Sequence, residues 1–320
     1  MTFQPAVSVI IPIYNGQSDL EDLLRCLGAQ TYPRDRVEYF IVDNNSSDNT
    51  LERLQTAAQK AASDGWGLRV LQESAIQSSY AARNRGICAA NAPLLAFTDA
   101  DCRPEPTWLE RLMQPFENPA IGLVAGEVQA LPGSSLLEQY ADRQETLSQK
   151  HTLAHPFCPY GQTANLALRR SLLESVGLFR PYLTTGGDAD LCWRILRETA
   201  CQWHFAESAI VRHRHRQTLA ELLSQWRRYG RSNRFLHDLH GIGLMAEPLP
   251  KYYGYRLARW GLKEFPIALL RLLFRQSSLV DLINTPIGLL CLNARWQGQQ
   301  QAQLPEPARE IAPFPTKAAL

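Results

Sequence analysis

The segment that decides the fold is Val7-Ser-Val-Ile-Ile-Pro-Ile-Tyr14, an apolar run closed by the turn residues Asn15-Gly16. Continuous rather than alternating hydrophobicity predicts a strand that is buried on both faces, as in a parallel sheet. The same reasoning predicts strands at 37–42, 68–72 and 93–98, separated by helices near 18–30, 50–62 and 79–90. This alternation is typical of βαβ units and predicts an α/β fold around a mostly parallel sheet.

Polar residues follow these strands at the end where parallel sheets bind ligands. Asn15 follows the first strand, Asp43 the second, and Asp99 and Asp101 the fourth. Two carboxylates at i and i+2 can reach one divalent cation and the ribose of a nucleotide, and Mg²⁺ and Mn²⁺ prefer such oxygen ligands. Because this triplet also occurs as turn and capping chemistry, its interpretation depends on the rest of the chain.

Six segments together resemble the family 2 glycosyltransferases, which have the GT-A fold. They are Val9-Ile-Ile-Pro-Ile-Tyr-Asn15, Ile41-Val-Asp-Asn-Asn-Ser-Ser-Asp-Asn-Thr50, Ala82-Arg-Asn-Arg-Gly86, Phe97-Thr-Asp-Ala-Asp101, Ala164-Asn-Leu-Ala-Leu-Arg-Arg170 and Gly187-Asp-Ala-Asp-Leu-Cys-Trp-Arg194. They occur in the family's order, within residues 7–230. The resemblance implies a Rossmann-like, mostly parallel sheet flanked by helices, with a C-terminal helical extension.

The resemblance also implies an activity: transfer of a sugar, with inversion, from a nucleoside-diphosphate sugar to a hydroxyl acceptor. UDP-sugars are the default donors, and the acceptors are those of polysaccharide, glycolipid or cell-surface glycan synthesis. The implied donor-binding residues are Pro12, Tyr14 and Asn15 around the base, Asp43 on the base with Arg83 nearby, and Asp99 on the ribose. Asp101 would hold Mn²⁺ or Mg²⁺, which neutralises the departing diphosphate. Asn44 stands where the family usually has a second aspartate, and it can still accept a hydrogen bond.

The segment from Gly187 resembles the family's Glu-Asp motif, whose Asp removes the proton from the acceptor hydroxyl. Asp188 holds the Asp position, so the resemblance makes it the catalytic base, while Gly187 replaces the Glu. The replacement leaves the Glu's contribution to acceptor binding unassigned. Asp188 and Asp190 also lie where a helix begins, and for Asp190 we expect N-capping instead of catalysis.

Two further motifs keep alternatives open. His213 follows an apolar strand, where the family places a metal-binding histidine, and His215 is the alternate ligand. Gln225-Trp-Arg-Arg-Tyr229 resembles an element of processive members, in which Arg228 would approach the diphosphate. A solvated basic helix face explains Arg228 equally well.

The C-terminal part of the chain is basic and aromatic. Residues 212–275 carry thirteen Lys and Arg against four acids, interleaved with Trp, Tyr and Phe. These helices are expected either to contact a membrane surface peripherally or to pack on the catalytic domain. The expected organisation is 1–105 for the nucleotide-sugar half, 106–216 for the acceptor half with a helix over 136–150, 217–297 for the helical extension, and 298–320 for a disordered tail.

Composition bounds the remaining possibilities. A net charge of +2 gives no sign of nucleic-acid binding, and the seven scattered cysteines fit reduced thiols in the cytoplasm. No apolar run reaches bilayer length. Two other functions stay open: a nucleotidyltransferase, which the absence of a basic residue in Asn15-Gly-Gln-Ser-Asp19 disfavours, and a non-catalytic glycan- or nucleotide-binding protein, which Gly187 keeps open.

Overall fold

The computed structural model describes residues 3–315, which form two compact units. The first unit comprises residues 3–129, 147–213 and 305–315, and the second comprises 130–146 and 214–304. The two expected halves, 1–105 and 106–216, thus contribute most of their residues to the same unit. The expected extension, 217–297, belongs to the second unit together with residues 130–146.

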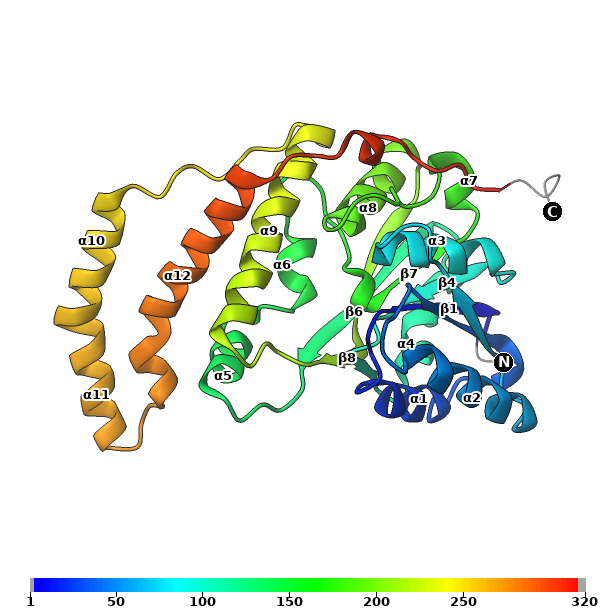
Figure 1. Ribbon diagram of the computed structural model, residues 1–320, viewed down its shortest axis with the longest axis horizontal. Helices are drawn as coiled ribbons and strands as arrows, with labels where there is room; N and C mark the ends of the chain where they lie inside the picture. The colour runs from blue at the N-terminus through cyan, green and yellow to red at the C-terminus, as the bar shows by residue number, and fades with distance from the viewer. Residues whose placement is uncertain (1–2, 316–320) are drawn as a thin grey trace. The chain divides into compact units, whose positions relative to one another are not determined.

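The first unit is built around a single sheet (Figure 1). Its strands are β1 (Val7–Ile13), β2 (Val37–Asp43), β3 (Leu68–Gln72), β4 (Leu94–Phe97), β5 (Cys102–Pro104), β6 (Ile121–Ala130), β7 (Leu166–Arg169) and β8 (Gln202–His213). Their order is β3-β2-β1-β4-β7-β6-β8-β5. The strands β3, β2, β1 and β4 are parallel, whereas β7 is antiparallel to β4 and β5 is antiparallel to β8. The expected parallel sheet is therefore present, extended by antiparallel strands.

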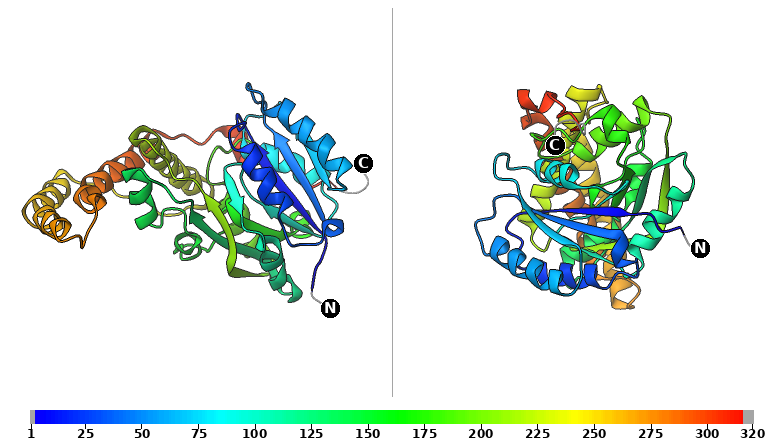
Figure 2. Two further views of the ribbon diagram at one scale, coloured as in Figure 1. Left: turned by 90° about the horizontal axis from the view of Figure 1, so that it is seen from below. Right: turned by 90° about the vertical axis from the view of Figure 1, so that its right-hand side faces the viewer.

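Helices cover both faces of the parallel part (Figure 2). The helices of this unit are α1 (Leu20–Gly28), α2 (Thr50–Ser63), α3 (Ser79–Ala89), α4 (Trp108–Met113), α6 (Gln149–Leu153), α7 (Leu172–Val176) and α8 (Gly187–Glu198), with short 3-10 turns at Arg34–Arg36, Gln114–Glu117, Thr163–Asn165 and Glu306–Arg309. Every residue of β1 is buried. Val9 and Ile11 join the core with Leu23 of α1 and Leu54 of α2.

The opposite face of β1 packs on α3 through a close approach. A Cβ on Gly86 would lie 2.6 Å from a methyl of Ile10, so only glycine permits this helix–strand distance. Burial on both faces explains why the sequence of β1 is continuously apolar. The strand ends therefore emerge from a rigid core, which fixes the loops that follow them.

One predicted helix is wrong. The expected helix over 136–150 is divided into α5 (Leu136–Arg143) and α6, with the break at 144–148. Glu145 adopts a positive φ of 46°, which a helix cannot accommodate. The Ser148 hydroxyl then accepts a hydrogen bond from the Lys150 amide and starts α6 as a new helix.

The second unit is helical. It contains α5, α9 (Leu219–His240), α10 (Pro250–Arg259), a π-helical turn (Trp260–Glu264), α11 (Phe265–Leu273) and α12 (Leu279–Gln301). The helices α9 and α12 pack side by side, and α10 and α11 lie along α12 (Figure 1). Capping boxes start three of them: Ser135 with Glu138 at α5, Thr218 with Glu221 at α9, and Ser278 with Asp281 at α12. Across residues 3–315, we find no helix with the length and hydropathy needed to cross a bilayer.

The prediction of a disordered tail over 298–320 is also wrong for the described residues, 298–315. Helix α12 continues to Gln301, and the segment from Pro305 packs within the first unit. Arg180 donates a hydrogen bond to the Arg309 carbonyl, and the Leu178 amide donates to the Ala312 carbonyl at 2.9 Å. Side chains of the tail also pack: Ala308 is fully buried, and the Arg170 guanidinium lies over the Phe314 ring at 4.7 Å. A few apolar residues in a Gln- and Pro-rich segment are therefore enough to order it. Residues 316–320 lie outside the described part of the chain.

Candidate active site

Asp43 ends β2 as a buried carboxylate with one oxygen available. Its Oδ2 accepts a hydrogen bond from the Ser46 amide at 3.2 Å, while Oδ1 is buried and, within residues 3–315, has no hydrogen-bond partner. Asn15, with a φ of 47°, accepts from the Ser47 amide at 2.8 Å and so joins the loop after β1 to the loop after β2. These loops present an unsatisfied acceptor at the carboxyl end of the sheet. Such an atom needs a donor from a ligand or from solvent.

Arg83 and Asp99 form an ion pair next to this loop. Arg83 lies on α3 and is 3% exposed, and its guanidinium donates to Asp99 Oδ1 at 2.5 Å and to the Ser79 hydroxyl at 3.1 Å. Asp99 follows β4, so the pair connects α3 to the carboxyl end of the sheet. The predicted donor residues Arg83 and Asp99 are thus brought together.

Asp188 lies in the first turn of α8 and is close to the same ion pair. Its two oxygens accept hydrogen bonds from the Thr163 hydroxyl at 3.1 Å and the Thr163 amide at 3.3 Å. Burial raises the pKa of Asp188, the Arg83 charge lowers it, and the Asp99 charge raises it again. A half-buried carboxylate with a raised pKa is suited to accept a proton.

Asp190 does not cap the helix, which corrects the sequence expectation. Its side chain is completely buried and accepts from Arg180 Nε at 3.0 Å and from Arg194 Nε at 3.1 Å. Gly186, in the left-handed region with φ 80°, is the N-cap residue of α8. Asp190 is therefore a structural anchor that fixes the helix on which Asp188 lies.

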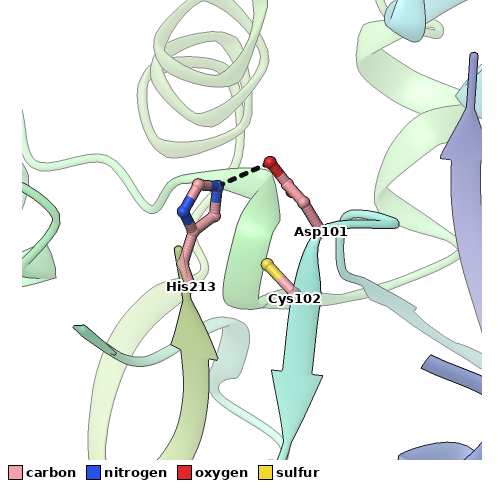
Figure 3. Close-up of side chains that lie close together, drawn as sticks. All are labelled: Asp101, Cys102 and His213. Atoms are coloured by element: carbon pink, nitrogen blue, oxygen red, sulfur yellow. Dashed lines mark ion pairs between the residues drawn. The ribbon is translucent and has the colours of Figure 1, made fainter. Parts of the chain in front are cut away.

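Asp101 and His213 face one another across two paired strands (Figure 3). His213 Nε2 lies 3.2 Å from Asp101 Oδ2, and Cys102 is directly opposite His213 in the ladder. One ligand atom from each of Asp101, Cys102 and His213 lies within 4.8 Å of the others. A carboxylate oxygen and an imidazole nitrogen this close fit Mn²⁺ or Mg²⁺. A thiol is a soft ligand, which Mn²⁺ and Mg²⁺ do not prefer, so Asp101 and His213 are better suited to these ions than Cys102.

The remaining predicted residues are less closely gathered. Pro12 is buried in β1, and Tyr14 is 54% exposed in the loop that follows. Arg228 is exposed on α9, and His215 is buried, both in the second unit. Their roles in donor or metal binding therefore stay predictions.

Sequence reasoning missed Thr163 and Tyr80. Thr163 holds both oxygens of Asp188, and the charge of Asp188 raises the pKa of the Tyr80 hydroxyl. The one available signal for Tyr80 was its place one helical turn before Arg83, which puts both on the same face of α3. Nothing in the sequence indicates Thr163.

The fold and the carboxylates at its strand ends define the class of protein as a glycosyltransferase of the GT-A type. A mannosyltransferase from Pyrobaculum calidifontis, solved in complex with GDP-Man and Mn²⁺, superimposes with a TM-score of 0.64 at 20% identity, over 94% of this chain and 88% of that one. This likeness establishes the fold.

The chain belongs to glycosyl transferase family 2, whose sequence profile matches residues 8–177. A second profile, glycosyl transferase family group 2, matches residues 94–293. The chain is 35% identical to glycosyltransferase AglE of Haloferax volcanii over 58% of its length and 59% of the relative's. It is 29% identical to the undecaprenyl-phosphate 4-deoxy-4-formamido-L-arabinose transferase of Pseudomonas aeruginosa, over 58% of its length and 55% of the relative's. The match thus spans little more than half of each relative.

Proposed function

We propose that the protein transfers a sugar, with inversion, from a nucleoside-diphosphate sugar to a hydroxyl group of a lipid-linked or glycan acceptor. The observation that carries the proposal is the carboxylate arrangement at the sheet edge. Asp188 interacts electrostatically with Arg83 and Asp99. Asp101 lies two residues after Asp99 in the same loop and pairs with His213. In this proposal, Asp188 acts at the acceptor end of the bond that forms and the cation site acts at the diphosphate end of the bond that breaks.

The donor would bind along the loops that follow β1, β2 and β4. The free Oδ1 of Asp43 can accept an N–H from the base, which would satisfy its buried acceptor. Asp99 would accept from the ribose hydroxyls while Arg83 keeps it in place. UDP is the default nucleotide, and the GDP-Man complex of the mannosyltransferase makes GDP the first alternative to test.

Asp101 and His213 would hold the divalent ion, and a bound ion would neutralise charge on the leaving diphosphate. Asp188 accepts the proton of the acceptor hydroxyl while the oxygen of that hydroxyl forms a bond to the anomeric carbon. The bond from that carbon to the diphosphate oxygen breaks, and the diphosphate leaves with the electron pair. Attack from the opposite side gives inversion.

Replacing either metal-binding residue should weaken Mn²⁺ binding. We expect Asp101→Ala and His213→Ala each to reduce Mn²⁺ affinity at least about tenfold, because removing a ligand costs no less than removing its supporting group. Isothermal titration with Mn²⁺ and UDP measures this effect directly. His215→Ala is the matched histidine control: a larger effect there would move the ligand from His213 to His215.

The second unit offers a surface for a lipid-linked acceptor. Exposed apolar side chains run along α10, the π-helical turn and α11; they include Tyr255, Leu270 and Leu273, and Leu262 in the turn is 84% exposed. Basic side chains flank this α10–α11 surface; they are Lys251, Arg256, Lys263, Arg271 and Arg275. An apolar stripe with basic flanks fits an anionic bilayer. The Pseudomonas relative, which is named for undecaprenyl phosphate, gives independent support.

Vesicle binding tests the α10–α11 surface. We expect the protein to sediment with vesicles containing phosphatidylglycerol, and Leu262→Glu with Leu273→Glu to reduce the bound fraction at least about tenfold, because each buried leucine contributes about 2 kcal/mol. Leu290→Glu on α12, where the leucine is 45% exposed, is the matched control. Equal sedimentation with and without vesicles would instead support packing of these residues on other protein surfaces.

A panel of UDP-, GDP- and dTDP-sugars, assayed for nucleoside-diphosphate release with Mn²⁺ and then with chelator, tests the reaction itself. Metal-dependent release from one donor in the presence of polyprenyl phosphate or a lipid extract would identify donor and acceptor class. Donor binding without release under all these conditions would favour a binding protein instead.

A further inference from the structure

The glycine before the base is in close contact with an aromatic ring. A Cβ built on Gly187 would lie 2.7 Å from Cζ of Tyr80 and 2.8–2.9 Å from both Cε atoms. Real side chains do not approach so closely, and the neighbour is a rigid ring and not a flexible chain end. Position 187 therefore accepts no side chain while Tyr80 keeps its place, which accounts for the glycine where the family has Glu.

Two neighbouring side chains hold the Tyr80 ring in that place. It is 5% exposed, stacks on Phe179 at a centroid distance of 5.5 Å, and lies under the Arg83 guanidinium at 5.4 Å. These contacts direct the hydroxyl end of the ring toward the first turn of α8. The ring cannot move aside without losing both contacts and exposing its apolar surface.

The Tyr80 hydroxyl interacts with the base itself. Burial raises the pKa of Tyr80 well above its usual value, and the charge of Asp188 raises it further, whereas the charge of Arg83 lowers it. A phenol that stays protonated is a hydrogen-bond donor at every physiological pH. The carboxylate of Asp188, one residue from the glycine that the ring contacts, can accept such a hydrogen bond.

We propose that Tyr80 is a positioning residue for Asp188, donating a hydrogen bond that orients the carboxylate and replaces the missing neighbour at position 187. The inference rests on the proposed role of Asp188 as the base. Tyr80 and Gly187 act as one unit, since the ring needs the glycine and the base needs the hydroxyl.

The hydrogen bond has a measurable effect on the titration of Asp188. A donor to the ionised form favours that form and lowers the pKa of the carboxyl. The other charged or titratable groups that act on Asp188 are Arg83, Asp99 and the thiol of Cys192. None of these changes when the Tyr80 hydroxyl is removed, so Tyr80→Phe should raise the Asp188 pKa by about one unit.

The experiment compares wild type, Tyr80→Phe and Tyr32→Phe. Phenylalanine preserves the ring and its packing, so a purely structural role for Tyr80 predicts no change. Tyr32 is the matched control, a 3% exposed tyrosine whose hydroxyl donates to the Pro5 carbonyl at 2.6 Å. Carboxyl-¹³C aspartate labelling follows the titration, and the spectrum of Asp188→Asn identifies the signal.

For Tyr80→Phe we expect the raised Asp188 pKa, a matching shift of the acidic limb of kcat to higher pH, and about a tenfold lower kcat with unchanged donor KM. Gly187→Ala should displace the ring and raise the same pKa. Adding Gly187→Ala to Tyr80→Phe should raise it little further, because both act through one hydroxyl.

An unchanged Asp188 pKa in Tyr80→Phe overturns the inference, whether or not the enzyme turns over. A raised pKa with an unshifted kcat profile also overturns it, because the hydroxyl would then not act through the base. If wild type releases no nucleotide from any donor while Tyr80→Phe still moves the titration, the proposed reaction fails and the hydrogen bond stands.

Discussion

Asp188→Asn is expected to lower kcat about a thousandfold, within the range by which general bases accelerate reactions, and to leave donor affinity unchanged. The amide keeps the shape of the carboxylate and its contact with Thr163, but it cannot accept the acceptor's proton. In the proposed mechanism, donor binding depends on Asp43, Asp99 and the metal site, none of which the substitution replaces. Single-turnover sugar transfer and isothermal titration with the donor separate the two effects.

Asp64→Asn, an exposed aspartate at the end of α2, is the matched control and should retain full turnover. A wild-type rate in Asp188→Asn would show that another group takes the proton. Loss of donor binding together with rate would assign Asp188 to the donor site and not to the acceptor hydroxyl.

The stability of Asp188→Asn should be at least that of wild type at neutral pH. Burial raises the pKa of Asp188, so folding favours the protonated carboxyl over the ionised one and costs free energy wherever the carboxylate is ionised. Asparagine removes that charge. In wild type the same shift makes turnover decline as the pH falls through the raised pKa, because only the ionised carboxylate accepts a proton.

Local patterns predicted the parallel half of the sheet and the residues at its edge. Strand β1 is recognisable because burial on both faces requires a continuous apolar run, and Asn15, Asp43 and Asp99 follow strand ends. Parallel topology then brings these loops to one edge. The pairing of Asp101 with His213 was inferred from family resemblance alone, because only tertiary structure brings β5 beside β8.

Other features depend on contacts between distant segments. The structural role of Asp190 depends on its ion pairs with Arg180 and Arg194. From sequence alone, a carboxylate near the start of a helix is equally consistent with an N-cap. The tail after Pro305 is ordered by contacts with residues far earlier in the chain, namely Arg170, Leu178 and Arg180. Tyr80 and Gly187 lie far apart in the chain. In the sequence, Gly187 therefore appears only as a missing glutamate, and its contact with the Tyr80 ring is visible only in the structure.

The second large effect concerns the packing of the helical unit, where α9 and α12 meet at two glycines. A Cβ on Gly230 would overlap the Arg295 carbonyl oxygen and lie 2.7 Å from the Gln299 amide nitrogen, and a Cβ on Gly298 would overlap the Arg227 carbonyl oxygen. These neighbours are backbone atoms, so no side chain can rotate away. The two helices would have to separate along their whole contact.

Gly230→Ala should therefore destabilise the protein by about 3 kcal/mol, the upper range for overpacking, even though alanine favours a helix by about 1 kcal/mol over glycine. Gly254→Ala on α10 is the matched control, because its Cβ meets nothing within 4 Å and only the gain in helix propensity remains. Urea unfolding measures both free energies. Opposite signs for these two identical substitutions follow only from close α9–α12 packing; a stabilised Gly230→Ala variant would mean that the helices are further apart in solution.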